Sequence, residues 1–284
     1  MDGILLINKP INLTSHDVIN KLRRKLKIKR IGHAGTLDPF ASGVLVVGVG
    51  QGTKCLQFLE ILDKEYLGVI KLGIKTNTGD LTGEVIETKE VNELDENQIN
   101  DVLTSFVGEQ EQIPPMFSAL KVEGKKLYEL ARKGVEIERK PRSIYIHSLS
   151  LKGYNSDEKT LTFTVKCSKG TYVRTLGEDI ASKLNTVGHL ISLTRTKVGD
   201  FKLVDCYDLE DYLDDKFISI KDALKHLKHY QVKNDIEEKM VFNGRKIKLK
   251  IKEDLVLILN QKEEPMAVYQ RINENIFASL RGFN

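Results

Sequence analysis

One carboxylate in this sequence stands in a loop whose composition suits the presentation of a reactive group. Asp38 belongs to Gly32-His33-Ala34-Gly35-Thr36-Leu37-Asp38-Pro39, and Gly43 closes the same stretch before an apolar run. Glycine and proline punctuation predicts an irregular loop, here over residues 31–43. A carboxylate that a loop presents to a pocket can attack an electrophile covalently. An Asp before a Pro is also an ordinary turn initiator, so the loop alone leaves both interpretations open.

A run of cations directly precedes that loop. Seven of the ten residues from Lys21 to Arg30 are basic, and Leu22 and Leu26 hold the apolar positions between them. Thr14-Ser15-His16-Asp17 supplies a hydroxyl N-cap before apolar residues at helical spacing, which predicts that a helix begins there. A basic amphipathic helix that ends at a glycine-containing loop can follow a phosphate backbone.

Gly48-Val49-Gly50-Gln51-Gly52-Thr53-Lys54 follows an apolar run and invites comparison with phosphate-binding loops. A Walker loop ends in Gly-Lys-Ser/Thr, and a dinucleotide fingerprint has a third Gly or Ala where this chain has Thr53. We therefore interpret the stretch as a tight turn of small residues. The sequence contains no His-Glu-x-x-His, Cys-x-x-Cys or Gly-x-Ser-x-Gly, so it does not support a metallohydrolase or a serine hydrolase.

The elements that must position these groups mix strands and helices without a regular alternation. Apolar runs and alternating patterns predict strands at 44–49, 66–72 and 83–88, and an antiparallel hairpin of 143–151 with 160–167. Helical patterns lie at 95–107, 124–133 and from about 173 to 184. This mixture favours an α+β fold with a large, mostly antiparallel sheet. Beyond an acidic stretch at 205–215, expected at the surface, short strands within 240–284 predict a small β-rich C-terminal domain.

Composition places the chain among globular proteins of ordinary size. It has 284 residues, a formal net charge of +4 and 40% hydrophobic residues, and its apolar runs are too short to span a membrane. Three widely spaced cysteines give neither a disulfide framework nor a metal cluster, and they fit a reducing cytosol. No secretory signal is evident at the N-terminus. The charge is unevenly distributed: residues 61–120 and 200–215 are acidic, and the stretches 1–60, 121–152 and 166–199 are basic. That pattern is typical either of solvated faces or of a basic surface for a polyanion.

Several motifs, in order along the chain, resemble the TruB family of bacterial tRNA pseudouridine-55 synthases. Gly32–Pro39, with Ala41 and Gly43-Val44-Leu45, is similar to the catalytic motif of that family. Further stretches resemble its other motifs: Asn8-Lys9-Pro10 with Thr14-Ser15, Lys64-Glu65-Tyr66, Ile113 to Lys121 with Gly124, Leu127-Tyr128 and Ala131-Arg132, Ser168 to Thr175, and His189-Leu190 with Leu193. The matches run from residue 8 to about residue 199, and the remainder is similar only in position and β content.

The resemblance implies a pseudouridine synthase fold, in which helices flank a large mixed, mostly antiparallel sheet. A catalytic domain would occupy 1–215, and a small PUA-like RNA-binding accessory domain would occupy 216–284. The implied reaction isomerises uridine 55 in the T-arm stem-loop of tRNA: the N1–C1′ bond breaks, the uracil turns, and C5 bonds to the sugar. The base must first be flipped out of the folded RNA, at a cost of a few kcal/mol. No redox change occurs and no atoms are gained or lost, so neither a cofactor nor a metal is expected.

The same resemblance assigns roles to six residues. Asp38 would be the nucleophile, Arg174 its ion-pair partner, and Tyr66 the residue that stacks on the flipped base and assists proton transfer at C5. Tyr172 and Leu193 would shape the uracil pocket, and His33 would fill space beside the flipped nucleotide. Each of these types has a commoner structural role, such as a turn aspartate, a surface arginine or a core leucine, and the motif context favours the site.

Six cations are expected to contact the RNA backbone, where they would add affinity that depends on salt but little sequence choice: Lys9, Lys21, Arg23, Arg24, Lys25 and Lys27. Two positions depart from the family pattern. Asn12 replaces a glycine, and since Asn tolerates a left-handed backbone the turn can survive. Thr194-Arg195 stands where the family usually has two arginines, which weakens either a phosphate contact or a structural ion pair.

The sequence therefore predicts a cytoplasmic, monomeric tRNA-modifying isomerase that works without a guide RNA and without a membrane. Two alternatives use the same scaffold. One is an RNA-binding tRNA folding factor that does not depend on turnover, and the other is the guide-RNA-dependent relative of archaea and eukaryotes. Asp38, Tyr66 and Arg174 distinguish the enzyme from the folding factor, because a pure binding protein does not need all three.

Overall fold

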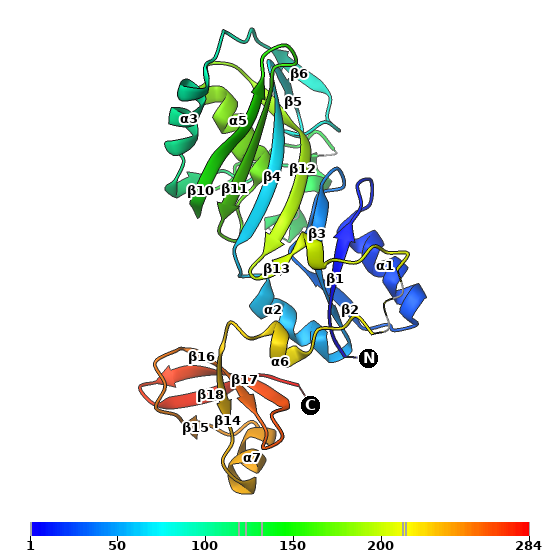
Figure 1. Ribbon diagram of the computed structural model, residues 1–284, viewed down its shortest axis with the longest axis vertical. Helices are drawn as coiled ribbons and strands as arrows, with labels where there is room; N and C mark the ends of the chain where they lie inside the picture. Colours follow the sequence, from blue (N-terminus) through cyan, green and yellow to red (C-terminus); the bar gives the residue numbers. More distant parts are fainter. Residues whose placement is uncertain are drawn as a thin grey trace.

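The computed structural model describes residues 2–118, 120–122, 124–131, 133–211, 213 and 215–283. Within these residues, nine strands form one sheet in the order β1-β3-β12-β4-β11-β10-β7, with β2 paired to β3 and β13 to β12 (Figure 1). The strands are β1 (Gly3–Lys9), β2 (Ile31–Ala34), β3 (Ser42–Val49), β4 (Lys64–Leu72), β7 (Gly108–Gln112), β10 (Arg142–Asn155), β11 (Thr160–Cys167), β12 (Gly188–Val198) and β13 (Phe201–Lys202). Neighbours pair antiparallel except β12 with β3, which run parallel. The predicted α+β class and its mostly antiparallel sheet are confirmed.

Two helices cover one face of the strands β10, β11, β4 and β12. They are α3 (Glu96–Thr104) and α5 (Val173–Lys183); in Figure 1, α5 lies behind the strands and α3 lies at the left, next to β10. Ile99 of α3 and Ile180 of α5 are fully buried in one hydrophobic cluster with Ile70 and Phe163 of the sheet. This packing fixes the N-terminus of α5 against the sheet, and Arg174 is the second residue of that helix.

The strands β1 and β3 are buried on both faces, which explains why their sequences are almost continuously apolar. Leu5 and Val47 pack with α1 (Ser15–Leu26) on one side. Ile4 and Val46 pack on the other side with α2 (Leu56–Leu59), which follows the 3₁₀ helix η1 (Gly50–Cys55). The register, with Leu5 opposite Val47, keeps each set on its own face.

The helix α1 begins where the hydroxyl signal predicted. Thr14 is the N-cap, its side chain accepts from the Asp17 backbone N–H, and the Asp17 carboxylate accepts from the Thr14 N–H. This reciprocal capping box satisfies two helix-end donors. The helix ends at Leu26, because Lys27 takes a left-handed conformation with φ of 54°, so the last basic residues of the run lie beyond it.

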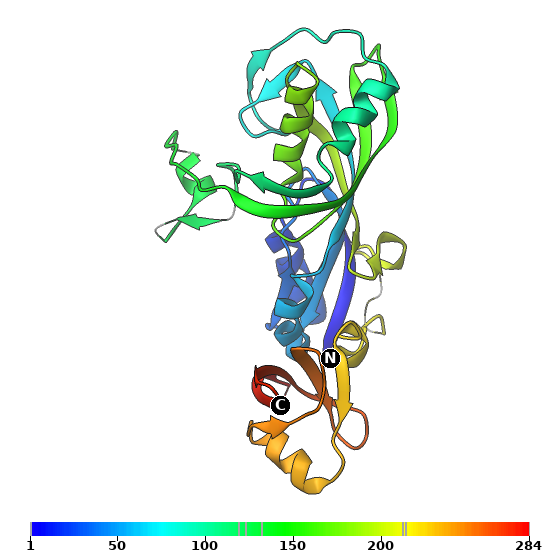
Figure 2. The same cartoon turned by 90° about the vertical axis from the view of Figure 1, so that its left-hand side faces the viewer.

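Two predicted elements were wrong in part. Residues 31–34 form the strand β2 instead of loop, since Ile31 to Ala34 pair with Val49 to Val46 across a non-local ladder. The expected helix at 124–133 is short: Gly124, with φ of +81°, turns the hairpin of β8 (Lys121–Val122) and β9 (Lys125–Lys126), and α4 covers only Leu127–Ala131. Figure 2 shows this green segment projecting from the body of the molecule.

The acidic segment and the C-terminal strands also differ from expectation in detail. Leu209 and Leu213 of the acidic segment are buried against the α1 side of the sheet, so this segment is only partly at the surface. Val241 and Phe242, expected among the short strands, end the helix α7 (Asp235–Phe242). Elsewhere, β5 (Ile74–Thr76) and β6 (Val85–Thr88) form a separate hairpin.

A second sheet follows at the C-terminal end. Its five described strands, in the order β14-β16-β17-β18-β15, are β14 (Lys228–Gln231), β15 (Ile247–Lys248), β16 (Leu255–Leu259), β17 (Pro265–Asn273) and β18 (Ile276–Gly282). Before it, η2 (Leu203–Asp205) and α6 (Ile220–Ala223) lead away from the large sheet, and Ile218 bridges Ile4 of β1. Leu257, Val268 and Phe283 join the cluster that contains Phe58 of α2, so the two sheets share apolar packing. No helix in the described part of the chain is long and apolar enough to cross a membrane.

Candidate active site

The residues on both sides of Asp38 are hydrogen-bonded to the stretch that runs from the end of β1 to the first residue of α1. Ser15 Oγ accepts from the Leu37 N–H at 2.9 Å and donates to the Leu37 carbonyl at 3.2 Å. On the other side of Asp38, the Pro39 carbonyl accepts from the Asn12 N–H at 2.8 Å. Asn12 has φ of 65°, so the residue that replaces the family glycine does adopt the left-handed turn. The N-terminal motif thus fixes the loop that carries the candidate nucleophile.

Lys9 belongs to this support, and its prediction as an RNA backbone contact was wrong. Its side chain is 0% exposed, and its ammonium donates to the carbonyls of Pro10 at 2.8 Å, Leu13 at 2.6 Å and Pro39 at 3.5 Å. Burial lowers the pKa of Lys9 to about 8. An ammonium whose donors are all directed at backbone carbonyls cannot also reach a phosphate at the surface.

Asp38 and Arg174 form a two-point ion pair. Arg174 Nε donates to Asp38 Oδ2 at 2.8 Å, and Nη2 donates to Oδ1 at 3.3 Å. The same guanidinium donates to the carbonyls of Thr78 at 2.7 Å and Phe117 at 2.6 Å, and it lies 3.6 Å from the Asp80 carboxylate. Since the arginine side chain is 4% exposed and that of Asp38 35% exposed, the pair orients a carboxylate that faces open space.

Burial and the neighbouring charges act in opposite directions on the pKa of Asp38. Burial raises the pKa of the Asp38 carboxyl above its ordinary value, and the positive charge of Arg174 acts against that shift. Asp80 raises the pKa further, whereas Lys9 lowers it. The two cations therefore favour the ionised form, which is the form that can act as a nucleophile.

Five of the six predicted catalytic and pocket residues line one open cavity of about 640 Å³: Asp38, Tyr66, Tyr172, Arg174 and Leu193. They come from the 35–41 loop, β4, the start of α5 and β12, which are far apart in the sequence. The described lining contains five cations (Lys64, Arg142, Lys169, Arg174 and Arg195) and two acids (Asp38 and Glu60). A cavity with this excess of positive charge suits an anionic ligand.

The two tyrosines have different supports. Tyr66 is 9% exposed on β4, burial raises the pKa of its hydroxyl, and Arg195 counters that shift by its charge and by a hydrogen bond. Tyr172 is held through its backbone, since its N–H donates to Gln112 Oε1 at 2.7 Å and its carbonyl accepts from Gln112 Nε2 at 3.0 Å. Burial also raises the pKa of Tyr172. Both phenols are therefore neutral at physiological pH, with apolar rings beside the cavity.

His33 lies outside the described cavity lining, on β2. Burial lowers its pKa to about 4, with Arg195 and His16 adding to the shift, so the imidazole is neutral. Its Nδ1 is buried without a hydrogen-bond partner among the described residues. The structure therefore places His33 on β2, which packs beside α1, and outside the described cavity lining.

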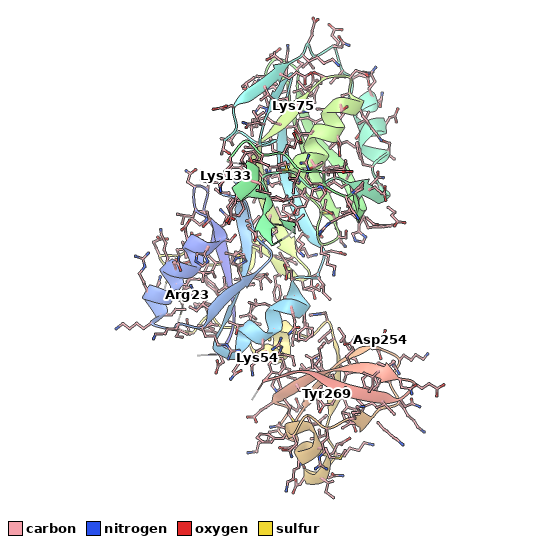
Figure 3. The ribbon with its side chains drawn as sticks, turned by 180° about the vertical axis from the view of Figure 1, so that it is seen from behind. Arg23, Lys54, Lys75, Lys133, Asp254 and Tyr269 are labelled. Carbon is pink, nitrogen blue, oxygen red and sulfur yellow. The ribbon has the colours of Figure 1, made fainter. Side chains whose placement is uncertain are left out.

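The basic run before the loop divides into two groups. Arg23 lies on α1 (Figure 3) and donates from Nη2 to the Ile31 carbonyl at 3.0 Å, and Lys25 donates to the carbonyls of Leu209 and Asp211. Those two side chains tie α1 to its neighbours. Lys21, Arg24 and Lys27 are exposed, as Lys25 is, but among the described residues their side chains make no hydrogen bond outside α1. This second group is the one positioned to meet a phosphate backbone.

Four residues at or beside the site were missed by reasoning from the sequence: Lys64, Asp80, Gln112 and Arg195. Arg195 is 1% exposed, and it donates to the carbonyls of Val44 at 2.7 Å and Gly35 at 3.1 Å. Lys64 belongs to a recognised motif but had no role assigned, and Gln112 directly precedes another one. Next to Arg195, Thr194 Oγ1 lies 3.0 Å from Ser42 Oγ at the β3–β12 junction, so this departure from the family makes a strand contact.

Two motif residues, Ala119 and Arg132, lie outside the described residues. Among the residues that are described, no group of three or more His, Cys, Asp or Glu side chains could hold a metal ion. The geometry of the site supports the chemistry of a loop-borne carboxylate that a buried arginine orients in a cationic cavity with aromatic walls.

Comparison with known proteins agrees with this chemistry. Residues 23–173 match the family model described as TruB family pseudouridylate synthase (N terminal domain). The chain is 44% identical to tRNA pseudouridine synthase B of Bacillus subtilis (strain 168), over 86% of this chain and 82% of that protein. It is 40% identical to the protein of the same name from Mesoplasma florum, over 99% of this chain and 97% of that protein.

Solved structures agree on the fold. A chain from the crystal structure of a Cbf5-Nop10-Gar1 complex superposes with a TM-score of 0.76 at 23% identity, covering 99% of this chain and 85% of that one. A chain of the archaeal box H/ACA sRNP Nop10-Cbf5 complex gives a TM-score of 0.73 at 22% identity, with 99% and 86% coverage. At this identity the likeness speaks for the fold alone.

Proposed function

The chain belongs to the TruB family of pseudouridylate synthases, and from that premise we propose that it converts uridine 55 in the T-arm of tRNA into pseudouridine. The observation that carries the proposal is the Asp38–Arg174 pair, held at 2.8 Å in a cavity whose walls include Tyr66, Tyr172 and Leu193. A carboxylate that is held, oriented and open to a base-sized space is what an enzyme of this class requires. A protein that only binds RNA has no need of it.

The proposed reaction begins with extrusion of the target base from the folded RNA, which costs a few kcal/mol. The flipped uracil enters the cavity, where Tyr66 stacks on it and Tyr172 and Leu193 shape the pocket. Asp38 attacks as the nucleophile, and Arg174 keeps the carboxylate ionised and directed into the cavity. After C5 has bonded to C1′, the proton on C5 is removed with the help of Tyr66. We assign His33, which lies on β2 outside the described cavity lining, to the RNA beside the flipped nucleotide.

Contact with the rest of the tRNA is assigned to cationic surfaces. Lys21, Arg24 and Lys27 are exposed beside the loop, and we assign them to phosphates of the T-arm stem-loop. We divide the chain into a catalytic unit, 1–215, and a PUA-like accessory unit, 216–284, which binds RNA through its own basic residues. The protein works on tRNA as a monomer in the cytoplasm, without a guide RNA.

A tRNA transcript labelled with tritium at uracil C5 tests the proposal, because formation of pseudouridine at position 55 releases that label. The wild-type chain alone is expected to release tritium. Asp38→Asn is expected to bind the transcript and to release none, since the amide is not a nucleophile. Asp157→Asn, in the exposed turn between β10 and β11, is the matched control and should behave as wild type.

The outcomes separate the alternatives. Binding without tritium release by the wild-type chain would refute the enzyme and favour an RNA folding factor. Release that required an added guide RNA would refute the stand-alone mode. Release from a transcript in which position 55 is cytidine would refute the choice of target.

A further inference from the structure

Two cations, Lys64 and Arg195, lie beside Tyr66 in the lining of the cavity. Lys64 and Tyr66 are two residues apart on β4, so their side chains lie on one face of the sheet. Arg195 of β12 pairs directly with Tyr66 across the ladder. All three line the cavity. Both cations also converge on Gly35, because a Cβ there would lie 3.4 Å from Arg195 Nη1 and 3.9 Å from Lys64 Cε.

These cations are buried, and their charge is not neutralised. Lys64 is 6% exposed and donates to the Glu60 carbonyl, whereas Arg195 donates to the carbonyls of Val44 and Gly35. Within the described part of the chain, neither cation forms an ion pair with a carboxylate. Backbone carbonyls satisfy their hydrogen bonds but supply no negative charge, and an unpaired buried charge is costly.

The charge of Arg195 acts on Lys64. Burial lowers the pKa of Lys64 to about 8, and Arg195 lowers it further, while Cys167, Glu60 and Asp63 act in the opposite direction. The Asp38 carboxylate is already held by Arg174. The cavity therefore keeps a second pair of cations, Lys64 and Arg195, with which no described carboxylate forms an ion pair.

In the proposed reaction, the uracil ring itself becomes the anion that can face Lys64 and Arg195. Attack of Asp38 on C1′ breaks the N1–C1′ bond, and the electron pair of that bond leaves on the uracil ring. Attack on C6 instead pushes the C5–C6 electron pair towards O4. On either route the ring holds one additional negative charge, shared with its carbonyl oxygens, until C5 bonds to C1′. On the C1′ route, C5 displaces the Asp38 carboxylate as it bonds to C1′. On the C6 route, the N1–C1′ bond breaks before C5 bonds to C1′, and the carboxylate is later eliminated from C6. Loss of the C5 proton and protonation at N1 then complete the isomerisation, with Asp38 regenerated.

We propose that Lys64 and Arg195 form an anion site that stabilises this negative charge on the uracil ring. The inference rests on the proposed function. Charged donors that are fixed in advance where charge develops stabilise that charge without reorganisation during the reaction. Arg195 lies cross-strand from Tyr66, and its charge counters the rise that burial causes in the pKa of that hydroxyl, so the stacking residue and the anion site are adjacent.

Substitution of Lys64 tests the inference, because Arg195 also holds β3 and its loss could unfold the chain. Lys64→Met keeps the length of the side chain and removes the charge. We expect kcat for tritium release to fall by about a hundredfold with KM changed by less than about threefold, as for loss of one charge-stabilising donor. Lys64→Arg retains the charge and is expected to recover most of the lost rate. Ethylammonium added to Lys64→Ala is expected to restore part of it, because the cavity is open.

The matched control is Lys71→Met. Lys71 lies on the same strand, its ammonium also donates to a backbone carbonyl, that of Glu158, and it is outside the cavity lining. Its kcat should equal that of wild type. Equal kcat values for Lys64→Met and Lys71→Met, or a loss that neither Lys64→Arg nor ethylammonium repairs, would overturn the inference. A wild-type chain without activity would instead overturn the proposed function.

Discussion

The hydroxyl of Ser15 is a stringent test of how the chain holds its nucleophile. Ser15→Ala removes the bonds at 2.9 Å and 3.2 Å to the N–H and carbonyl of Leu37, which directly precedes Asp38. Ser15 is 1% exposed and Leu37 3% exposed, so water cannot replace the lost partner. A buried N–H left unsatisfied costs about 1–3 kcal/mol, and this is the expected loss in the free energy of unfolding. The released loop no longer fixes the carboxylate, so kcat should fall by about ten- to a hundredfold.

Urea unfolding gives the free energy, and tritium release from labelled tRNA gives kcat. Ser150→Ala, at an exposed position of β10, is the control and should change neither quantity. Unchanged stability would show that the hydrogen bonds to Leu37 do not hold the loop. A variant that lost stability but kept the wild-type kcat would refute the argument that Ser15 positions Asp38.

Two further predictions concern the basic run and His33. The double variant Lys21→Gln/Lys27→Gln should lower the slope of log K against log salt for tRNA binding by as much as about two units. Lys9→Met should leave that slope unchanged and lower the free energy of unfolding. Equal slopes for the wild type and both variants would contradict the assignment of Lys21 and Lys27 to phosphates. Because the pKa of His33 is lowered to about 4, the unfolded chain takes up a proton below pH 6.5 that the folded chain does not. The free energy of unfolding should therefore fall by about 2 kcal/mol between pH 7 and pH 5, and His33→Gln should remove that part of the slope. A pH dependence that persists in full in the variant would assign it to other groups.

Local signals predicted the elements that are stabilised locally. The Thr14 cap, the strand at 66–72 and the hairpin of β10 with β11 depend on patterns a few residues long, and the structure has each of them. In contrast, β2 depends on pairing with β3 and contains Gly32, so its sequence shows only the punctuation of a loop. The expected helix at 124–133 failed because Gly124 adopts positive φ and turns a hairpin.

The motifs, which occur in family order along the chain, predicted the residues that line the site. They did not predict side chains whose hydrogen-bond partners are set by how distant parts of the chain pack. Asp38, Tyr66, Tyr172, Arg174 and Leu193 line one cavity, as residues with the expected shared roles would. The residue type of a lysine near the N-terminus, by contrast, does not show whether its ammonium contacts a phosphate or three backbone carbonyls. Its surroundings depend on how the chain packs, and for Lys9 they are wholly internal.

The burial of Lys9 has a physical reason in the placement of the nucleophile. The loop presents Asp38 to the cavity, so its backbone carbonyls are not paired by a regular strand or helix. Pro39 also has no N–H to donate to a strand partner. A buried ammonium reaches the Pro39 carbonyl at 3.5 Å, while the Asn12 N–H reaches the same oxygen at 2.8 Å. Its positive charge also lowers the pKa of the Asp38 carboxyl. One side chain therefore both supports the loop and favours the ionised nucleophile, and an uncharged substitute could take over only the first of these roles.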